Sequence, residues 1–193
     1  MVKVKLKGLP WFAVVLLVCL FAASGQTEGR ELVYTPLPIE QPETVIAANR
    51  PLVSYLAKQL KTPIAIRYEK NYEDILRLFQ EGKIDIVHLG PLPYVILRNS
   101  YTKAESLVAI NEPDGKATYT CAMVTAFDGP LSVEQVRRSI AFSQPLSTCG
   151  HLTAGYLLDK HGVKLEALHH DYLGNQDQVA LAVVKGTYEV GTL

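Results

Sequence analysis

Two hydroxyl residues, Ser147 and Thr148, stand where the sequence predicts the beginning of a helix. An apolar run at 139–142 reads as a strand, and the helical pattern that follows it ends at Gly162. Free backbone N–H groups and the positive end of the helix dipole favour an anion at such a position, and the hydroxyls add neutral donors. The simpler alternative is that one hydroxyl only caps its own helix, as Ser and Thr often do.

Cys149, next in the chain, suggests a different chemistry. A cysteine at a helix N-terminus is a setting that activates a thiolate nucleophile, so a thiol enzyme is one alternative. His151 is a poor base for it, because residues two apart on a helix point to different faces. The run at 169–171 (His-His-Asp) resembles a metal site, but neighbours on a strand face opposite ways and at most one His fits. We therefore expect neither an enzyme nor a metal or cofactor site.

The first 25 residues have the layout of an export signal. Lysines at positions 3, 5 and 7 precede an apolar run at 11–23, and small residues follow at 23–25. The apolar run is shorter than the roughly 20 residues that span a bilayer, which argues against the alternative of a membrane anchor. We expect cleavage before Gln26, a periplasmic location and no stable membrane insertion afterwards.

Charge argues against nucleic acid as a partner. The 193 residues include 19 basic and 19 acidic ones, and three of the basic residues lie in the predicted signal. The remaining 168 residues carry 16 basic against 19 acidic side chains, and a mildly acidic chain has no bulk attraction to a polyanion. The mature chain keeps two cysteines, Cys121 and Cys149. Export permits a disulfide, but two cysteines in a chain of this size are more typical of small buried side chains, so we expect them unpaired.

Strand-like and helix-like segments alternate along the chain. Expected strands lie at 31–36, 63–69, 83–89, 105–111, 119–126, 139–142, 166–172 and 188–193, and the main expected helices at 43–60, 71–82, 92–99, 147–162 and 176–185. This order is typical of α/β proteins, in which helices cover both faces of mostly parallel sheets. Ligands bind there at the carboxyl ends of strands, so the turns at 34–38, 88–94 and 143–150 are candidate sites.

Four segments together resemble one protein family. They are PLVSYL at 51–56, EGKIDIVHLGPLPYV at 81–95, FSQPLSTCGHL at 142–152 and GNQDQVALAVVKGTYEVGTL at 174–193. The sequence is similar to the phosphonate-binding family, the periplasmic substrate-binding proteins of phosphate, phosphite and phosphonate ABC transporters. The resemblance implies a type II periplasmic-binding fold, with lobe one at 26–115 and lobe two at 116–193. It also implies capture of a small oxyanion for an ABC transporter permease.

The resemblance further implies ligand-binding positions in both lobes: Ser147, Thr148, Cys149, Tyr94, Leu37, Gln176 and Glu189. Ser147 and Thr148 would contribute hydroxyl and backbone N–H groups, and Cys149 its N–H. Cys149 stands where the family usually has Ser, Gln176 where it commonly has His, and Glu189 where it usually has Asp.

The family continues well beyond the last expected strand, whereas this sequence ends at Leu193. The resemblance therefore implies that the C-terminal part of lobe one is missing, and we expect weak binding of phosphate or phosphonates. An exported sensory input domain of the same fold, which would report ligand occupancy to a partner protein, is an alternative that the sequence leaves open.

Overall fold

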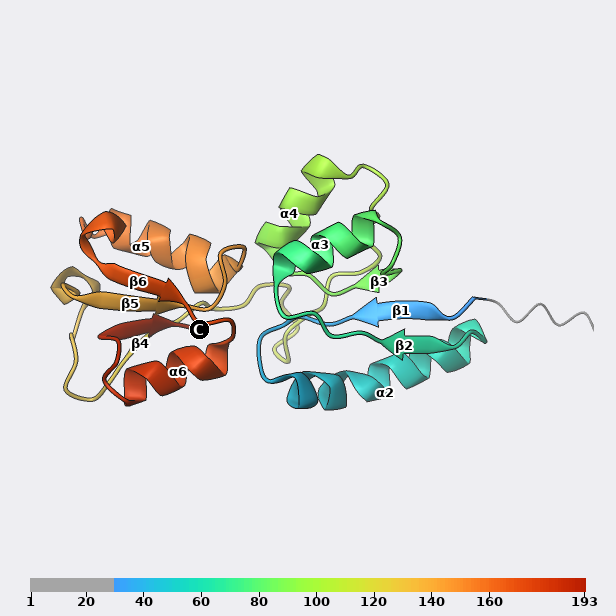
Figure 1. The fold of residues 1–193 in the computed structure, drawn as a ribbon, viewed down its shortest axis with the longest axis horizontal. Coiled ribbons are helices and arrows are strands. Elements are labelled where there is room, and N and C mark those ends of the chain that lie inside the picture. The colour runs from blue at the N-terminus through green and yellow to red at the C-terminus, as the bar shows by residue number, and fades with distance from the viewer. Residues whose placement is uncertain (1–29) are drawn as a thin grey trace, which may run out of the picture. The chain divides into compact units, whose positions relative to one another are not determined.

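Three short parallel strands form the first sheet of the computed structural model, which describes residues 30–193 (Figure 1). The strand order is β2 (Ile64–Ile66), β1 (Leu32–Thr35) and β3 (Ile86–Val87). Helix α2 (Pro42–Leu60) covers one face, and α3 (Tyr72–Gln80) and α4 (Pro91–Ser100) cover the other (Figure 1). The predicted signal at 1–25 lies outside the described residues.

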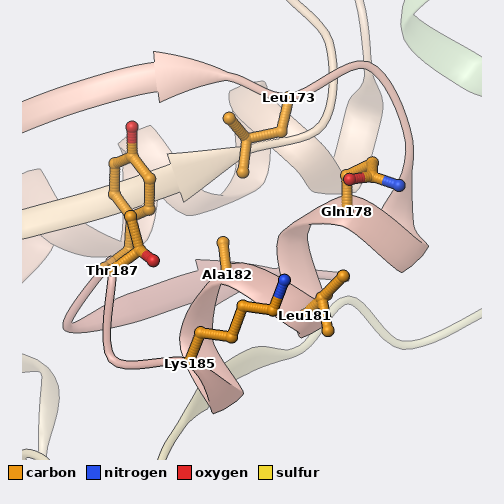
Figure 2. Close-up of a pocket in the computed structure, with 7 residues that line it drawn as sticks. Leu173, Gln178, Leu181, Ala182, Lys185 and Thr187 are labelled. Atoms are coloured by element: carbon orange, nitrogen blue, oxygen red, sulfur yellow. The ribbon is translucent and has the colours of Figure 1, made fainter.

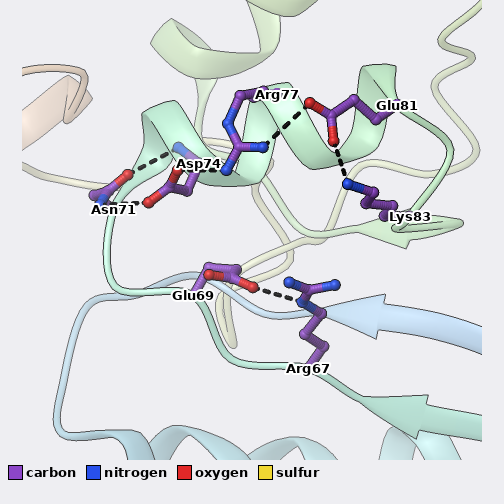
Figure 3. Close-up of polar contacts among 7 residues, drawn as sticks. All are labelled: Arg67, Glu69, Asn71, Asp74, Arg77, Glu81 and Lys83. Carbon is purple, nitrogen blue, oxygen red and sulfur yellow. Dashed lines mark hydrogen bonds and ion pairs between the residues drawn. The ribbon is translucent and has the colours of Figure 1, made fainter.

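Alternate residues of β1 face the two helix layers. The Tyr34 hydroxyl donates to Asn49 of α2 at 2.8 Å, whereas Val33 packs with Ile75 of α3. Asn71 caps α3, as its position in the sequence predicts, by accepting from the Asp74 N–H at 2.8 Å. Figure 3 shows this cap, the polar contacts that continue along α3 and the neighbouring Arg67–Glu69 pair. These exposed ion pairs contribute little to stability.

The second sheet has four strands and is mostly parallel. Its order is β4 (Met123–Thr125), β7 (Val190–Thr192), β5 (Ser139–Phe142) and β6 (His169–Tyr172), and only β4 is antiparallel to its neighbour. Helices α5 (Ala154–Lys160) and α6 (Gln176–Val184) lie on opposite sides of the sheet (Figure 1). Short helical turns η1 (Val133–Gln135), η2 (Thr148–Thr153) and η3 (Leu165–Ala167) complete this part.

The central strand β5 supplies both apolar layers of the second sheet. Its Ile140 and Phe142 pack with Leu158 of α5, and the intervening Ala141 packs with Val179 of α6. All of these side chains are buried. This alternation is what a strand covered on both faces requires, and the α/β class expected from the sequence is confirmed.

The expected strand at 105–111 is wrong. Residues 105–111 have no regular structure, and Leu107, Val108 and Ile110 are exposed. The apolar run at 107–110 is typical of a strand, but a strand needs a neighbour to pair with, and no described strand pairs with this segment. The expected strand at 119–126 is also shorter in the structure, where only β4 is a strand. Its hydrogen bonds depend on where β7 runs.

A single buried amide, that of Gln144, connects the two sheets. Gln144 comes shortly after β5 in the chain and is 3% exposed. Its Nε2 donates to the carbonyl oxygens of Pro38 at 3.1 Å, Lys70 at 3.2 Å and Gly174 at 2.8 Å. Its Oε1 accepts from the N–H of Tyr72 at 3.1 Å. The amide therefore joins the turn after β1, the start of α3 and the turn after β6.

Further contacts cross between the sheets. The Gln176 N–H, at the start of α6, donates to the Ile39 carbonyl at 2.9 Å, and the Gln41 N–H donates to the Asp177 carboxylate at 3.2 Å. Leu146 packs against the apolar core beneath α3 and α4. Residues Glu31–Leu193 consequently form one compact unit. Within residues 30–193, no helix has the length and apolar character needed to cross a membrane.

We predict that Gln144→Leu lowers the free energy of unfolding by about 2–4 kcal/mol, because it leaves the Tyr72 N–H and several carbonyls buried without partners. Urea unfolding followed by circular dichroism measures the loss. The matched control is Gln59→Leu, which changes an exposed amide on α2. Equal stability of the two variants would contradict a connecting role for Gln144.

Candidate functional site

Two helix beginnings, one beside each sheet, meet at a hydrogen bond. The N–H of Leu92, in the first turn of α4, donates to the Thr148 Oγ1 at the start of η2, 3.0 Å away. A Cβ placed on Gly90 would lie 3.4 Å from the Thr148 hydroxyl and 3.8 Å from the Tyr119 hydroxyl. We call this group, made of Gly90, Leu92, Thr148 and Tyr119, the helix-start site.

Local sequence explains why α4 presents here an N–H that has no partner within its own helix. Gly90 is extended, with φ of −73° and ψ of 170°, and Pro91 begins the helix, a position that suits its fixed φ and its missing N–H. Leu92 therefore carries the first N–H at this end of α4. The site lies where β3 ends, one of the turns that the sequence predicts as a binding position.

Ser147 and Thr148 have different roles although their side chains are alike. The Ser147 Oγ accepts from the Gly150 N–H at 2.9 Å, so it caps its own helix, which is the simpler alternative that the sequence offers. The Thr148 hydroxyl contacts α4 instead. Gly150 is required beside them, because a Cβ there would lie 1.8 Å from the Ser143 Oγ.

The two cysteines form a disulfide, which corrects the expectation that they are unpaired. Cys121 and Cys149 have Cα atoms 5.0 Å apart, although 28 positions separate them in the chain. The fold brings them together because the segment that enters β4 runs beside η2. A disulfide sulfur is not a thiolate, so the thiol-enzyme alternative based on Cys149 has no nucleophile in this structure.

Two titratable side chains near the site, His88 and Tyr72, favour their neutral forms. Burial lowers the pKa of the nearby His88 imidazole, which favours its neutral form at pH 7. The backbone N–H of His88 donates to the Thr35 carbonyl at 3.0 Å. The Thr35 hydroxyl is fully buried and has no hydrogen-bond partner among residues 30–193. Burial also raises the pKa of Tyr72, and the neighbouring Tyr119 adds to the rise. Neutral donors and helix N–H groups would therefore have to hold an anion here.

Three other predicted positions lie elsewhere in the fold. Tyr94 is the fourth residue of α4 and is exposed, and its backbone N–H donates to the Gly90 carbonyl. Leu37 packs in the apolar core beneath α3. Gln176 begins α6 and uses its main-chain N–H to join the sheets. In the part of the chain that the structure describes, no hydrogen bond joins any of the three to Thr148 or Tyr119.

Glu189 lies at the other end of β5 from Ser147. Its carboxylate accepts from the N–H groups of Arg137 at 2.9 Å and Arg138 at 2.8 Å, and its own N–H bonds to Ser139, the first residue of β5. Burial of this carboxylate works to raise its pKa, but the donors from Arg138 and Arg137 outweigh it and lower the pKa. The structure therefore does not bring Glu189 together with Thr148.

The roles of Tyr119 and Gln144 were not predicted from the sequence. Tyr119 falls in a segment predicted as a strand, and only the position of its hydroxyl, 3.8 Å from where a Cβ on Gly90 would lie, indicates a role. The polar side chain of Gln144 just after the buried run at 139–142 was an available indication.

A surface pocket and the possible metal ligands were the other candidate sites. Figure 2 shows a surface pocket of about 360 Å³ beside α6, lined by Leu173, Gln178, Leu181, Ala182, Lys185, Thr187 and Tyr188. None of these residues belongs to the helix-start site. Among the described residues, no group of three His, Cys, Asp or Glu side chains could hold a metal ion. His169 pairs with Asp171 at 3.1 Å instead.

Comparison with known proteins gives a consistent result. The family described as "ABC transporter, phosphonate, periplasmic substrate-binding protein" matches residues 34–193. The "Phosphate-import protein PhnD" of Mycolicibacterium smegmatis is 25% identical over 167 residues, which are 80% of this chain and 52% of the relative.

Two solved structures have the same fold. PhnD1 from Prochlorococcus marinus, in complex with methylphosphonate, superposes with a TM-score of 0.73 at 19% identity, over 84% of this chain and 62% of that one. A binding protein component of an ABC phosphonate transporter from Pseudomonas aeruginosa gives a TM-score of 0.71 at 16% identity, over 84% and 56%. The predicted type II periplasmic-binding fold is confirmed. The chain spans about half to three fifths of the length of these relatives.

We predict that Glu189→Gln lowers stability at neutral pH by about 1–3 kcal/mol, because it weakens charge-assisted bonds to two backbone N–H groups. The folded-state pKa of Glu189 is lowered from 4.5, so its contribution is present above pH 4.5 and disappears as the pH falls through the lower folded value. Urea unfolding of both proteins across this pH range measures how their free energies of unfolding converge as the pH falls. Glu105→Gln, at an exposed position, is the control. A stability difference that is independent of pH would contradict the assignment.

Proposed function

The chain belongs to the family of periplasmic substrate-binding proteins of phosphonate ABC transporters, and we propose that it binds a small phosphorus oxyanion at the helix-start site. This family consists of binding proteins rather than enzymes. The observation that carries the proposal is that the Thr148 hydroxyl, which accepts from the Leu92 N–H, and the Tyr119 hydroxyl both lie within 4 Å of one point beside Gly90. In this proposal, residues 26–115 and 116–193 act as the two lobes that contribute these groups.

The chemistry of the site suits an oxyanion. In the structure, the Thr148 oxygen accepts the hydrogen bond of the α4 N-terminus. A phosphoryl oxygen would replace it as the acceptor, since an anion gains more from the helix dipole than a neutral hydroxyl does. The Thr148 hydroxyl can then rotate and donate its own proton to the same ligand. The Tyr119 hydroxyl has no hydrogen-bond partner among residues 30–193 and is available as a further donor.

Gly90 has no side chain, so a ligand can approach the backbone closely. Gly90 leaves open the point at which both hydroxyls are within 4 Å, so a larger side chain there would occupy the space intended for the ligand. Burial favours the neutral form of His88, so this side chain adds no positive charge beside the anion. Recognition would then rest on donors arranged around the anion rather than on a salt bridge.

The relatives indicate which anions to test. PhnD1 of Prochlorococcus marinus is described as bound to methylphosphonate, and the mycobacterial relative is described as a phosphate-import protein. We propose the same class of ligand here. We also propose that residues 1–25 direct export to the periplasm and that an ABC transporter permease is the partner of the binding protein.

We predict that inorganic phosphate or methylphosphonate at millimolar concentration binds the chain and raises its melting temperature. Thr148→Val weakens this binding about tenfold or more, because it removes a donor to a charged ligand. Isothermal titration calorimetry measures both affinities. The control is Thr102→Val, which changes an exposed threonine after α4. If neither anion binds the unaltered chain, the proposed function is wrong.

A further inference from the structure

The Cys121–Cys149 disulfide joins the two chain segments that bring hydroxyls to the helix-start site. Cys121 follows Tyr119 by two positions, and Cys149 follows Thr148 by one. Since the two Cα atoms of the disulfide are 5.0 Å apart, the bond fixes these segments side by side. The two hydroxyls consequently lie within 4 Å of the same point beside Gly90.

Little else holds the segment that carries Tyr119. Residues 105–120 are exposed and have no regular structure. Their internal hydrogen bonds close a turn between Glu112 and Lys116, which does not involve either sheet. Regular pairing begins only at Ala122, which exchanges two backbone hydrogen bonds with Leu193, at 3.0 and 2.9 Å. Among the described residues, the disulfide is therefore the direct link between this segment and η2.

Tyr119 needs such a link in order to act in binding. The residue is 47% exposed, and no hydrogen bond within residues 30–193 holds its hydroxyl. An exposed segment without regular structure has many conformations, and selecting one of them when a ligand arrives costs affinity. A covalent bond two residues away reduces that freedom beforehand.

We propose that the Cys121–Cys149 disulfide is a positioning element of the oxyanion site, which holds the Tyr119 hydroxyl beside Thr148 so that one ligand meets both. This inference rests on the proposed function. It assigns to Cys149 a role other than the N–H donor that the family resemblance implies, because its side chain acts through Tyr119. The disulfide also stabilises the fold by closing a loop, so affinity has to be measured separately from stability.

The test is a double-mutant cycle on the full chain, with inorganic phosphate and methylphosphonate as the probes. Tyr119→Phe and the paired change Cys121→Ala with Cys149→Ala each weaken binding by about five- to twentyfold. Adding Tyr119→Phe to the protein without the disulfide costs less than about twofold more, because the hydroxyl is no longer in place. Tyr156→Phe, on an exposed tyrosine of α5, is the control and leaves affinity unchanged.

A second variant keeps the disulfide and covers the case in which its removal unfolds the protein. Two glycines inserted between Thr120 and Cys121 move Tyr119 away from the covalent link. They weaken binding as Tyr119→Phe does, while the melting temperature in the absence of ligand stays close to that of the unaltered chain. Two glycines inserted after Gly115, in the turn of the same segment, are the matched control and leave affinity unchanged.

The outcomes separate the two proposals. If the unaltered chain binds neither anion, the proposed function fails and the positioning role fails with it. If the unaltered chain binds but Tyr119→Phe has no effect, or has the same effect with and without the disulfide, only the positioning role is overturned. Full affinity after the insertion at Cys121 would overturn it as well.

Discussion

The buried amide of Gln144 is the interaction on which the rest of the arrangement depends. It satisfies three carbonyls and one N–H from three different turns, in a place that water does not reach. An unmade hydrogen bond in such surroundings costs about 1–3 kcal/mol, so the turns after β1 and β6 and the start of α3 must adopt their positions together. Thr148 follows Gln144 by four residues, and its contact with α4 is possible only because that arrangement is fixed.

Chemically similar groups have separate tasks around this centre. The Ser147 hydroxyl satisfies the N–H of its own helix turn, whereas the Thr148 hydroxyl satisfies an N–H that belongs to the other sheet. Glu189 shows the same division among carboxylates, since it closes the amino end of β5 while the candidate site lies near the carboxyl end. The ends of a parallel sheet differ in the backbone groups they leave free, and that difference determines which side chains can meet a ligand.

The segment between the two sheets marks the limit of pattern-based prediction. Residues 105–111 contain an apolar run like that of a strand, yet they have no partner among the described strands. Farther along the same connection lie Tyr119, whose hydroxyl is within 4 Å of the point beside Gly90, and Cys121, which is bonded to Cys149. Exposed apolar side chains and a covalent link thus occur within one irregular stretch, and periodicity describes neither.

The sequence by itself determined the α/β class, most helix positions and the helix start at Ser147, because these depend on periodicity and on capping chemistry within a few residues. The tertiary structure alone decided that Cys121 and Cys149 pair, that Thr148 rather than Ser147 contacts α4, and that Glu189 lies apart from them. The reason is distance along the chain. Leu92 and Thr148 are 56 positions apart, and no local pattern records which of two neighbouring hydroxyls will meet a backbone N–H from the other sheet.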